Sequence, residues 1–134
     1  MIGVGQEFPY FVKNGVDYVN AMCEVAYDDF NGWKVYYFYP KDFTFICPTE
    51  IKGMDMLTPE ATVVGFSGDN EFCKLAWKEN NELIKDIQHT LACDSGLELS
   101  KTLGIYDKLN GVCYRATYIV DPDGLIAHMS VNRD

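Results

Sequence analysis

One run of seven residues constrains the fold of this chain more than any other feature. Residues 33–39 read Trp-Lys-Val-Tyr-Tyr-Phe-Tyr, a β-branched and aromatic segment with little alternation between polar and apolar positions. Such a pattern is typical of a central strand that is covered on both faces. Pro40 follows at once and ends the strand, because proline has no N–H to donate to a ladder. The sequence therefore predicts a sheet with a layer packed on each face.

Around this strand the pattern alternates between strands and helices. Within the segment 44–56 we expect a helix that starts close to Cys47, with Pro48 in its first turn. A buried strand is expected over 61–66, and a second helix from 71 to about 87 that is capped by the turn at 67–70. A short helix is expected over 96–103, with a capping box at 95–98 and a glycine stop at 104. Two strands, 115–120 and 125–131, are joined by the turn Asp-Pro-Asp-Gly at 121–124.

The N-terminal thirty residues contain short apolar pieces separated by Asn14-Gly15 and Asn31-Gly32. These dipeptides favour tight hairpin turns, so small strands are expected there. With the elements that follow, the pattern predicts an α/β fold with a mixed central sheet flanked by helices, and the simplest such assembly is thioredoxin-like. The length of 134 residues suits one domain over 1–134.

Composition excludes several functions. The net charge is −9, so the chain repels polyanions, and we expect no nucleic-acid partner. No stretch of about 18 apolar residues occurs that could span a bilayer, and the N-terminus lacks the pattern of a signal peptide. We therefore expect a soluble cytoplasmic protein without a membrane partner.

The five cysteines stand at 23, 47, 73, 93 and 113, without a Cys-x-x-Cys pair. An odd number with wide gaps argues against both a disulfide framework and a zinc knuckle. We expect no metal and no cofactor, one or two reactive thiols, and packing roles for the rest.

Cys47 is the best candidate for a reactive thiol. It follows a buried strand and stands at the start of a helix, where unpaired N–H groups and the helix dipole favour negative charge. Only the deprotonated sulfur is a good nucleophile, so such a position suits a catalytic cysteine. The alternative is a small buried hydrophobe, which is the commoner role of a cysteine in apolar surroundings.

The neighbours of Cys47 favour the catalytic interpretation. Pro40, Thr44 and Cys47 form the pattern Pro-x-x-x-Thr-x-x-Cys, which resembles the active-site motif of the peroxiredoxins. The continuous match over 42–51 is similar to the typical two-cysteine subfamily, which includes the alkyl hydroperoxide reductase C subunit. The resemblance extends through 64–67, 76–77 and 115–124.

This resemblance implies a role for each matching residue. Cys47 would be the peroxidatic cysteine, Thr44 would hydrogen-bond the peroxide, Pro40 would shield the thiolate from water, and Arg115 would be its charge partner. Glu50 would orient the arginine, although an exposed helical glutamate is the alternative. The spacing agrees, since three residues separate Thr44 from Cys47 and a helical turn would let both face a common point.

Each of three aromatic residues can be interpreted in two ways. Trp77 resembles a family tryptophan near the active-site pocket, but a large aromatic on an amphipathic helix is more often core. Phe43 and Phe45 either line a pocket or belong to a subunit interface.

The implied activity is a thiol-dependent peroxidase that reduces hydrogen peroxide and alkyl hydroperoxides through a cysteine sulfenic acid. The implied partners are a thioredoxin-like or other dithiol reductant and a second copy of the chain, as a homodimer or a ring of dimers. Members of the family carry a resolving cysteine in a C-terminal tail, which we expect beyond Asp134. The alternative function is a redox-regulated chaperone or signalling module on the same fold. A thioredoxin-type disulfide reductase is disfavoured by the absence of Cys-x-x-Cys.

Overall fold

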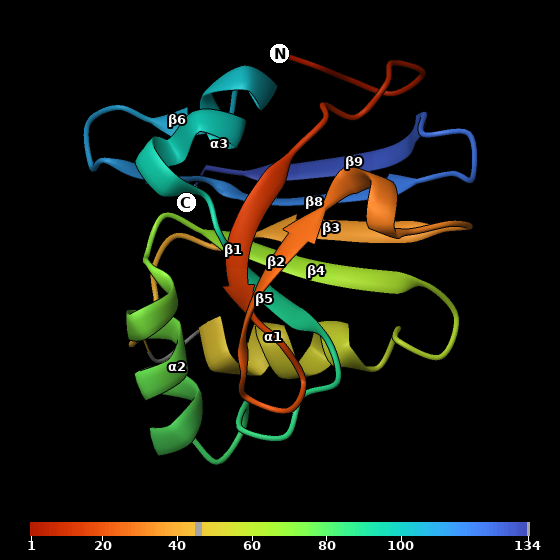
Figure 1. Ribbon diagram of the computed structural model, residues 1–134. Helices are drawn as coiled ribbons and strands as arrows, with labels where there is room; N and C mark the ends of the chain where they lie inside the picture. Colours follow the sequence, from red (N-terminus) through yellow and green to blue (C-terminus); the bar gives the residue numbers. More distant parts are fainter. Residues whose placement is uncertain (45–46, 134) are drawn as a thin grey trace.

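The computed structural model describes residues 1–44 and 47–133. Its centre is a seven-stranded sheet in the order β2-β1-β5-β4-β3-β8-β9 (Figure 1). Neighbours β3, β4 and β5 are parallel, and the other pairs are antiparallel. The strands are β1 (Val12–Val16), β2 (Met22–Ala26), β3 (Lys34–Phe38), β4 (Thr62–Ser67), β5 (Thr90–Cys93), β8 (Arg115–Val120) and β9 (Ile126–Asn132).

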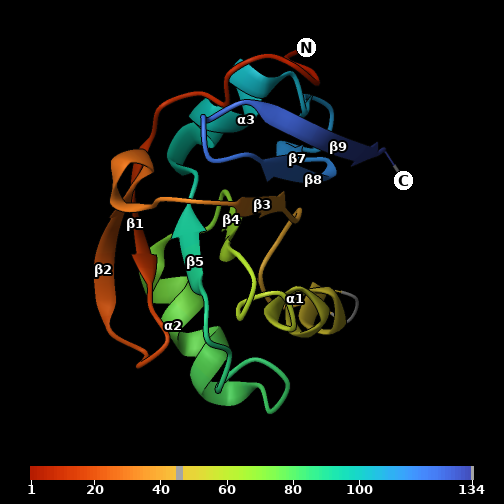
Figure 2. The same ribbon diagram turned by 90° about the vertical axis from the view of Figure 1, so that its right-hand side faces the viewer.

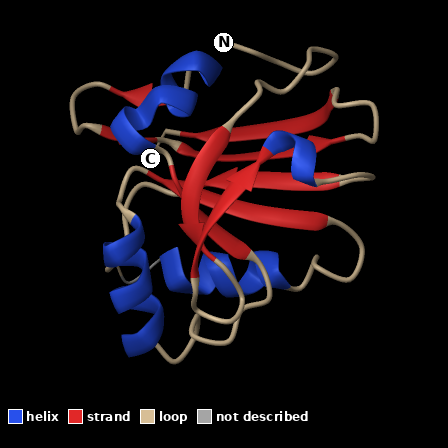
Figure 3. Ribbon diagram, in the orientation of Figure 1, coloured by secondary structure: helices blue, strands red, loops and turns tan. Residues whose placement is uncertain are grey.

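The helices cover both faces of this sheet. Helices α1 (Cys47–Asp55) and α2 (Glu71–Asn80) lie on one face, and α3 (Glu98–Leu103) lies on the other (Figure 2). Two 3₁₀ turns, Tyr27–Asp29 and Ser95–Leu97, and a small ribbon of β6 (Tyr106–Asp107) and β7 (Val112–Cys113) complete the described elements (Figure 3). The prediction of a mixed sheet flanked by helices is confirmed.

Strand β3 lies near the middle of the sheet, and all five of its residues are buried. Side chains alternate between faces along a strand. Tyr36 and Phe38 accordingly join the core beneath α3, whereas Val35, Tyr37 and the following Tyr39 join the core beneath α1 and α2. The aromatic run therefore fills two cores at once, as its lack of alternation predicted.

The hairpin turns predicted at the N-terminus are wrong. Asn14 and Gly15 lie inside β1, and the chain reverses at 17–21, where the Asp17 carboxylate accepts the N–H groups of Val19 and Ala21. Glycine is required at position 15 by a close approach, since a side chain there would meet the Leu91 carbonyl oxygen of β5.

The second dipeptide, Asn31-Gly32, turns the chain into β3 but joins no hairpin, because β2 and β3 are not paired. Gly32 has a φ of +76° there, a conformation that glycine adopts easily.

The second predicted helix is too long. Helix α2 ends at Asn80, and Asn81 has extended backbone angles while its side chain accepts the N–H of Leu83. Asparagine favours such local turns over continued helix. Ile84 and Ile87 still reach the core from the turns that follow.

At the other helix ends, the structure confirms two signals and corrects one. Asn70 caps α2 by accepting the Cys73 N–H, and Gly104 ends α3 with a φ of +81°. The predicted capping box at 95–98 is absent. The Asp94 carboxylate replaces it by accepting the N–H groups of Leu99 and Ser100, each at 2.8 Å.

The C-terminal hairpin is confirmed, with Asp121 accepting backbone bonds in the turn between β8 and β9. The described part of the chain contains no helix with the length and apolar character needed to cross a membrane.

Candidate active site

Cys47 opens helix α1, where it faces the sheet. Its side chain is fully buried in the core shared with Tyr37, Ile51 and Trp77. The first turn of a helix presents unpaired N–H groups, and Pro48 fits there because its missing N–H is not needed. Local sequence thus places the sulfur at the positive end of α1.

Arg115 brings a cation to this sulfur from the sheet. It is the first residue of β8, whose register with β3 pairs Ala116 with Phe38, so the side chain leaves the sheet where β3 ends. One guanidinium nitrogen, Nη2, lies 3.6 Å from Cys47 Sγ. The side chain is one-quarter exposed. Two residues 68 positions apart are thereby brought into contact, and the role of Arg115 as charge partner stays a prediction.

Glu50 holds the arginine in this position. Its Oε1 accepts a hydrogen bond from Arg115 Nε at 2.7 Å, and it stands three residues after Cys47 on α1. This bond is the main cause that raises the pKa of Arg115, with the nearby Cys47 as a smaller one. Of the two interpretations of Glu50, the contact favours the orienting one.

Pro40 and Thr44 lie in the loop between β3 and α1. Thr44 precedes α1, whose first residue is Cys47, so the predicted helix start close to Cys47 is confirmed. The Thr44 hydroxyl donates a hydrogen bond to the carbonyl of Lys41 at 3.3 Å. Pro40 borders a pocket of about 370 Å³ together with Lys41 and Gly68. Their action on a peroxide stays a prediction.

The aromatic residues divide between core and surface. Trp77 is 2% exposed and its ring lies 6.0 Å from those of both Tyr39 and Phe43, so it is a core residue bordering the loop. Phe43 is 57% exposed on the outer side of this pair. Phe45 lies outside the described residues.

The other four cysteines have thiols whose pKa is raised. Burial raises the pKa of Cys93 and of Cys113 to about 12, and that of Cys73 to about 11. Burial, followed by the charge of Asp17, also raises the pKa of Cys23. Their thiols are therefore poor nucleophiles near neutral pH.

Sequence reasoning missed a buried ionic network beside the site. Lys74 of α2 is fully buried, and its Nζ lies 3.4 Å from both carboxylate oxygens of Asp42 and 3.1 Å from the hydroxyl of Tyr39. Burial raises the pKa of Asp42, against the opposing effects of Lys74 and of the Tyr39 hydrogen bond. The available signal was the position of Lys74 three residues before Trp77, a spacing that puts both residues on the same face of the helix.

The same network contains three side chains, among the described residues, whose spacing would suit a metal ion. Ligand atoms of Asp42, Asp69 and Cys73 lie within 4.8 Å of one another. Because the ammonium of Lys74 already contacts both oxygens of Asp42, we interpret these residues as part of the ion pair.

A second buried chain of hydrogen bonds ties the far end of α1 to the sheet. Asp55, the last residue of α1, contacts His89 Nδ1 at 2.7 Å, and His89 Nε2 lies 2.6 Å from the Tyr37 hydroxyl. His89 therefore serves as a structural bridge, which explains its burial.

Comparison with known proteins shows the family of the chain. The AhpC/TSA family model matches residues 4–129. Alkyl hydroperoxide reductase C of Mycolicibacterium smegmatis is 33% identical over 98% of this chain and 75% of its own length. The protein of the same name from Staphylococcus aureus is 32% identical over 83% of this chain, which spans 62% of that relative.

Solved structures give the same result for the fold. Enterococcus faecalis AhpC has a TM-score of 0.91 at 28% identity and covers 99% of this chain and 83% of its own. The reduced 2-Cys peroxiredoxin of Plasmodium vivax has a TM-score of 0.90 at 32% identity and covers 98% and 86%.

The fold, with a thiol at the start of α1 and an arginine beside it, defines the class of peroxiredoxins, the thiol-dependent peroxidases of thioredoxin-like fold. The chain belongs to the AhpC/TSA family. The predicted fold class and family are therefore confirmed.

Proposed function

We propose that this chain is a peroxidase that reduces hydrogen peroxide and alkyl hydroperoxides, with Cys47 as the attacking nucleophile. One observation carries the proposal. The Arg115 guanidinium lies 3.6 Å from Cys47 Sγ while Glu50 holds it from the other side at 2.7 Å. A fixed cation beside a cysteine at a helix start is the environment in which a thiolate acts as a nucleophile.

In the first step the Cys47 thiolate attacks the terminal oxygen of the hydroperoxide. A sulfur–oxygen bond forms as the oxygen–oxygen bond breaks, and the leaving alkoxide takes a proton to depart as alcohol, or as water from hydrogen peroxide. The sulfur is oxidised to sulfenic acid and the peroxide is reduced. Arg115 stabilises the charge that develops on the departing oxygen.

In the second step a dithiol donor restores Cys47. A resolving thiol, which we propose to lie beyond Asp134, attacks the sulfenic sulfur, releasing water and forming a disulfide with Cys47. The two thiols of the donor then reduce this disulfide, which frees both cysteines and leaves the donor as a disulfide. The electrons come from the donor, which we propose to be a thioredoxin-like or comparable dithiol protein. We further propose that Thr44 hydrogen-bonds the peroxide and that Pro40 limits the access of water.

A redox-regulated chaperone or signalling module is not favoured. The family relatives are named as reductases, and a binding module needs no guanidinium held against a cysteine. The test is consumption of hydrogen peroxide and of an alkyl hydroperoxide with a dithiol donor in excess. Sustained turnover above that of the donor alone supports the proposal. Binding of unfolded clients without peroxide consumption would overturn it.

Three further proposals concern organisation and location. We propose a single domain over 1–134, a homodimer or ring of dimers, and a cytoplasmic location. The wide cysteine spacing supports a reducing compartment, and Phe43 beside the site offers exposed apolar surface for association. Sedimentation at micromolar concentration tests the oligomer, and a monomer there would contradict it.

A further inference from the structure

The loop between β3 and α1 adopts a conformation that needs support. Phe43 has a φ of +59°, a left-handed value that bulky residues rarely adopt, and it directly precedes Thr44. Its ring is mostly exposed and lies 6.0 Å from the ring of Trp77. Contacts of its neighbours must therefore hold the backbone at this point.

Those contacts converge on Asp42. Its N–H donates to Asp69 Oδ2 at 2.7 Å, and its carboxylate accepts the Tyr39 hydroxyl at 2.7 Å. Both carboxylate oxygens also lie 3.4 Å from the ammonium of Lys74, which is itself completely buried. The residue before Phe43 is thus fixed by side chain and backbone together.

Lys74 is the centre of this arrangement. Its ammonium contacts Asp42 of the loop, Tyr39 at the end of β3 and Ser67 at the end of β4. A buried ion pair contributes little stability compared with a well-packed apolar pair, but it strongly disfavours any arrangement that separates its charges. A pair at this place selects one loop conformation.

We propose that Lys74 is a positioning residue for the peroxide reaction, acting through Asp42 to hold the loop that carries Thr44. The inference rests on the proposed function and adds to it, because Lys74 touches neither the Cys47 sulfur nor Arg115. Misplacement of a reacting group by about 1 Å can cost on the order of 100-fold in rate. Loss of the ammonium is therefore expected to slow peroxide reduction by at least about tenfold.

The chain offers a matched control for a Lys74→Met variant. Lys78 is one turn further along α2, is also completely buried, and its Nζ donates to the Asp17 carbonyl at 2.9 Å, at the turn between β1 and β2. Lys78→Met removes an equivalent buried lysine without touching the loop. Any general effect of losing such a residue appears in both variants.

Two rates are measured. The first is the second-order rate constant of Cys47 with hydrogen peroxide, monitored by mass spectrometry of the trapped sulfenic acid, and the second is the rate of Cys47 alkylation by iodoacetamide. We expect Lys74→Met to lower the peroxide rate at least tenfold and the alkylation rate much less, with Lys78→Met within about twofold of wild type in both. If Lys74→Met fails to fold, Lys74→Met with Asp42→Asn replaces it, since no unpaired charge then stays buried.

A double-mutant cycle with Thr44→Val separates positioning from a general structural role. If Lys74 acts through the loop, Thr44→Val slows the reaction less in the Lys74→Met background than in wild type. Independent effects of the two substitutions would overturn the inference, as would an unchanged peroxide rate in Lys74→Met or a Thr44→Val variant as fast as wild type. A wild-type chain that does not react with peroxide would instead overturn the proposed function.

Discussion

Replacing Arg115 by alanine should slow the reaction of Cys47 with hydrogen peroxide by about 100- to 1000-fold. The substitution removes a charge 3.6 Å from the sulfur and a hydrogen-bond donor. At this distance two unit charges interact by about 1 kcal/mol in water and by about 4–5 kcal/mol at an effective dielectric of 20. Because the arginine side chain is one-quarter exposed, an intermediate value of about 2–3 kcal/mol is appropriate. Loss of one donor to a developing anion alone costs about 100- to 1000-fold.

Two further variants sharpen this prediction. Arg115→Lys keeps the charge but has no planar fork to bond Glu50 and the sulfur together, so its rate should fall between those of wild type and alanine. Arg133→Ala is the control, because it removes another arginine of the chain, one whose guanidinium stacks over the ring of Tyr114. The assay is stopped-flow reaction with peroxide under single-turnover conditions. An Arg115→Ala rate within about threefold of the Arg133→Ala rate would refute the assigned role of the guanidinium.

Two other properties of the chain can be predicted. Cys93 and Cys113, with pKa values raised to about 12 by burial, should be alkylated far more slowly than Cys47 at pH 7, and peroxide should form no disulfide between either and Cys47; peptide mapping after oxidation checks both expectations. Stability should fall as the pH drops below about 6.5, because burial lowers the pKa of His89 and the unfolded chain binds that proton first. Burial alone would raise the pKa of Asp55, but the hydrogen bonds from His89 and Gln88 lower it, so a further loss of folding stability is expected below about pH 3.8. Urea unfolding midpoints measured against pH check this, and a midpoint that rises on acidification would contradict it.

The sequence predicted best the features that depend on local pattern. The run at 33–39 specifies a strand buried on both faces whatever surrounds it, and Asn70 and Gly104 end helices through bonds within a few residues. The hairpin predicted at Asn14-Gly15 is wrong because glycine is needed there for the close approach of the Leu91 carbonyl of β5, a strand that is distant in sequence. A dipeptide cannot distinguish a turn from such a close approach between strands.

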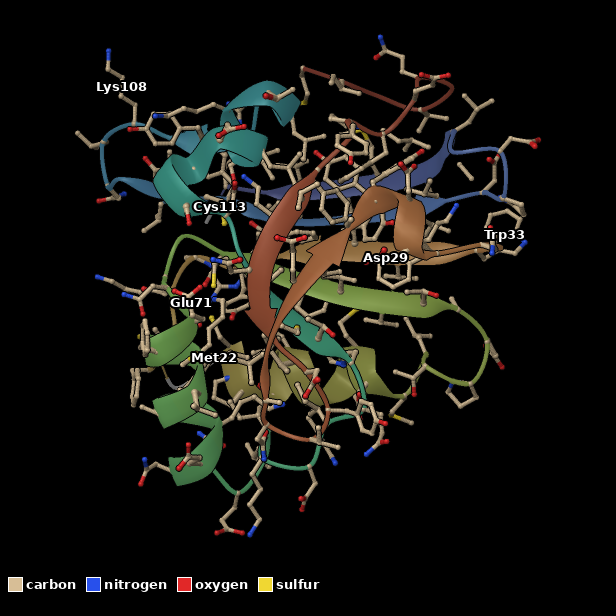
Figure 4. The ribbon with its side chains drawn as sticks, in the orientation of Figure 1. Met22, Asp29, Trp33, Glu71, Lys108 and Cys113 are labelled. Carbon is tan, nitrogen blue, oxygen red and sulfur yellow. The ribbon has the colours of Figure 1, made fainter. Side chains whose placement is uncertain are left out.

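The site shows the same division. Cys47 at a helix start follows from local sequence, whereas Arg115 was assigned through a family resemblance and is brought to the sulfur only by the pairing of β8 with β3. Sequence reasoning missed the pair of Lys74 and Asp42 because 32 residues separate them. A charged side chain considered alone is also expected to be exposed to solvent. Strand β3 itself runs along the sheet between the site and the far edge of the molecule. Trp33, labelled in Figure 4, directly precedes β3, whereas Tyr39 and the loop that carries Thr44 follow the other end of that strand.

The most direct test of the account is to locate the oxidised residue after one equivalent of hydrogen peroxide. Wild-type protein is oxidised in the presence of a sulfenic-acid trap and digested, and each cysteine peptide is quantified by mass spectrometry. We predict that the trap labels Cys47, and that Cys47→Ser neither takes up the label nor consumes peroxide with a dithiol donor. Predominant labelling of another cysteine, or turnover by Cys47→Ser near the wild-type rate, would contradict the central claim.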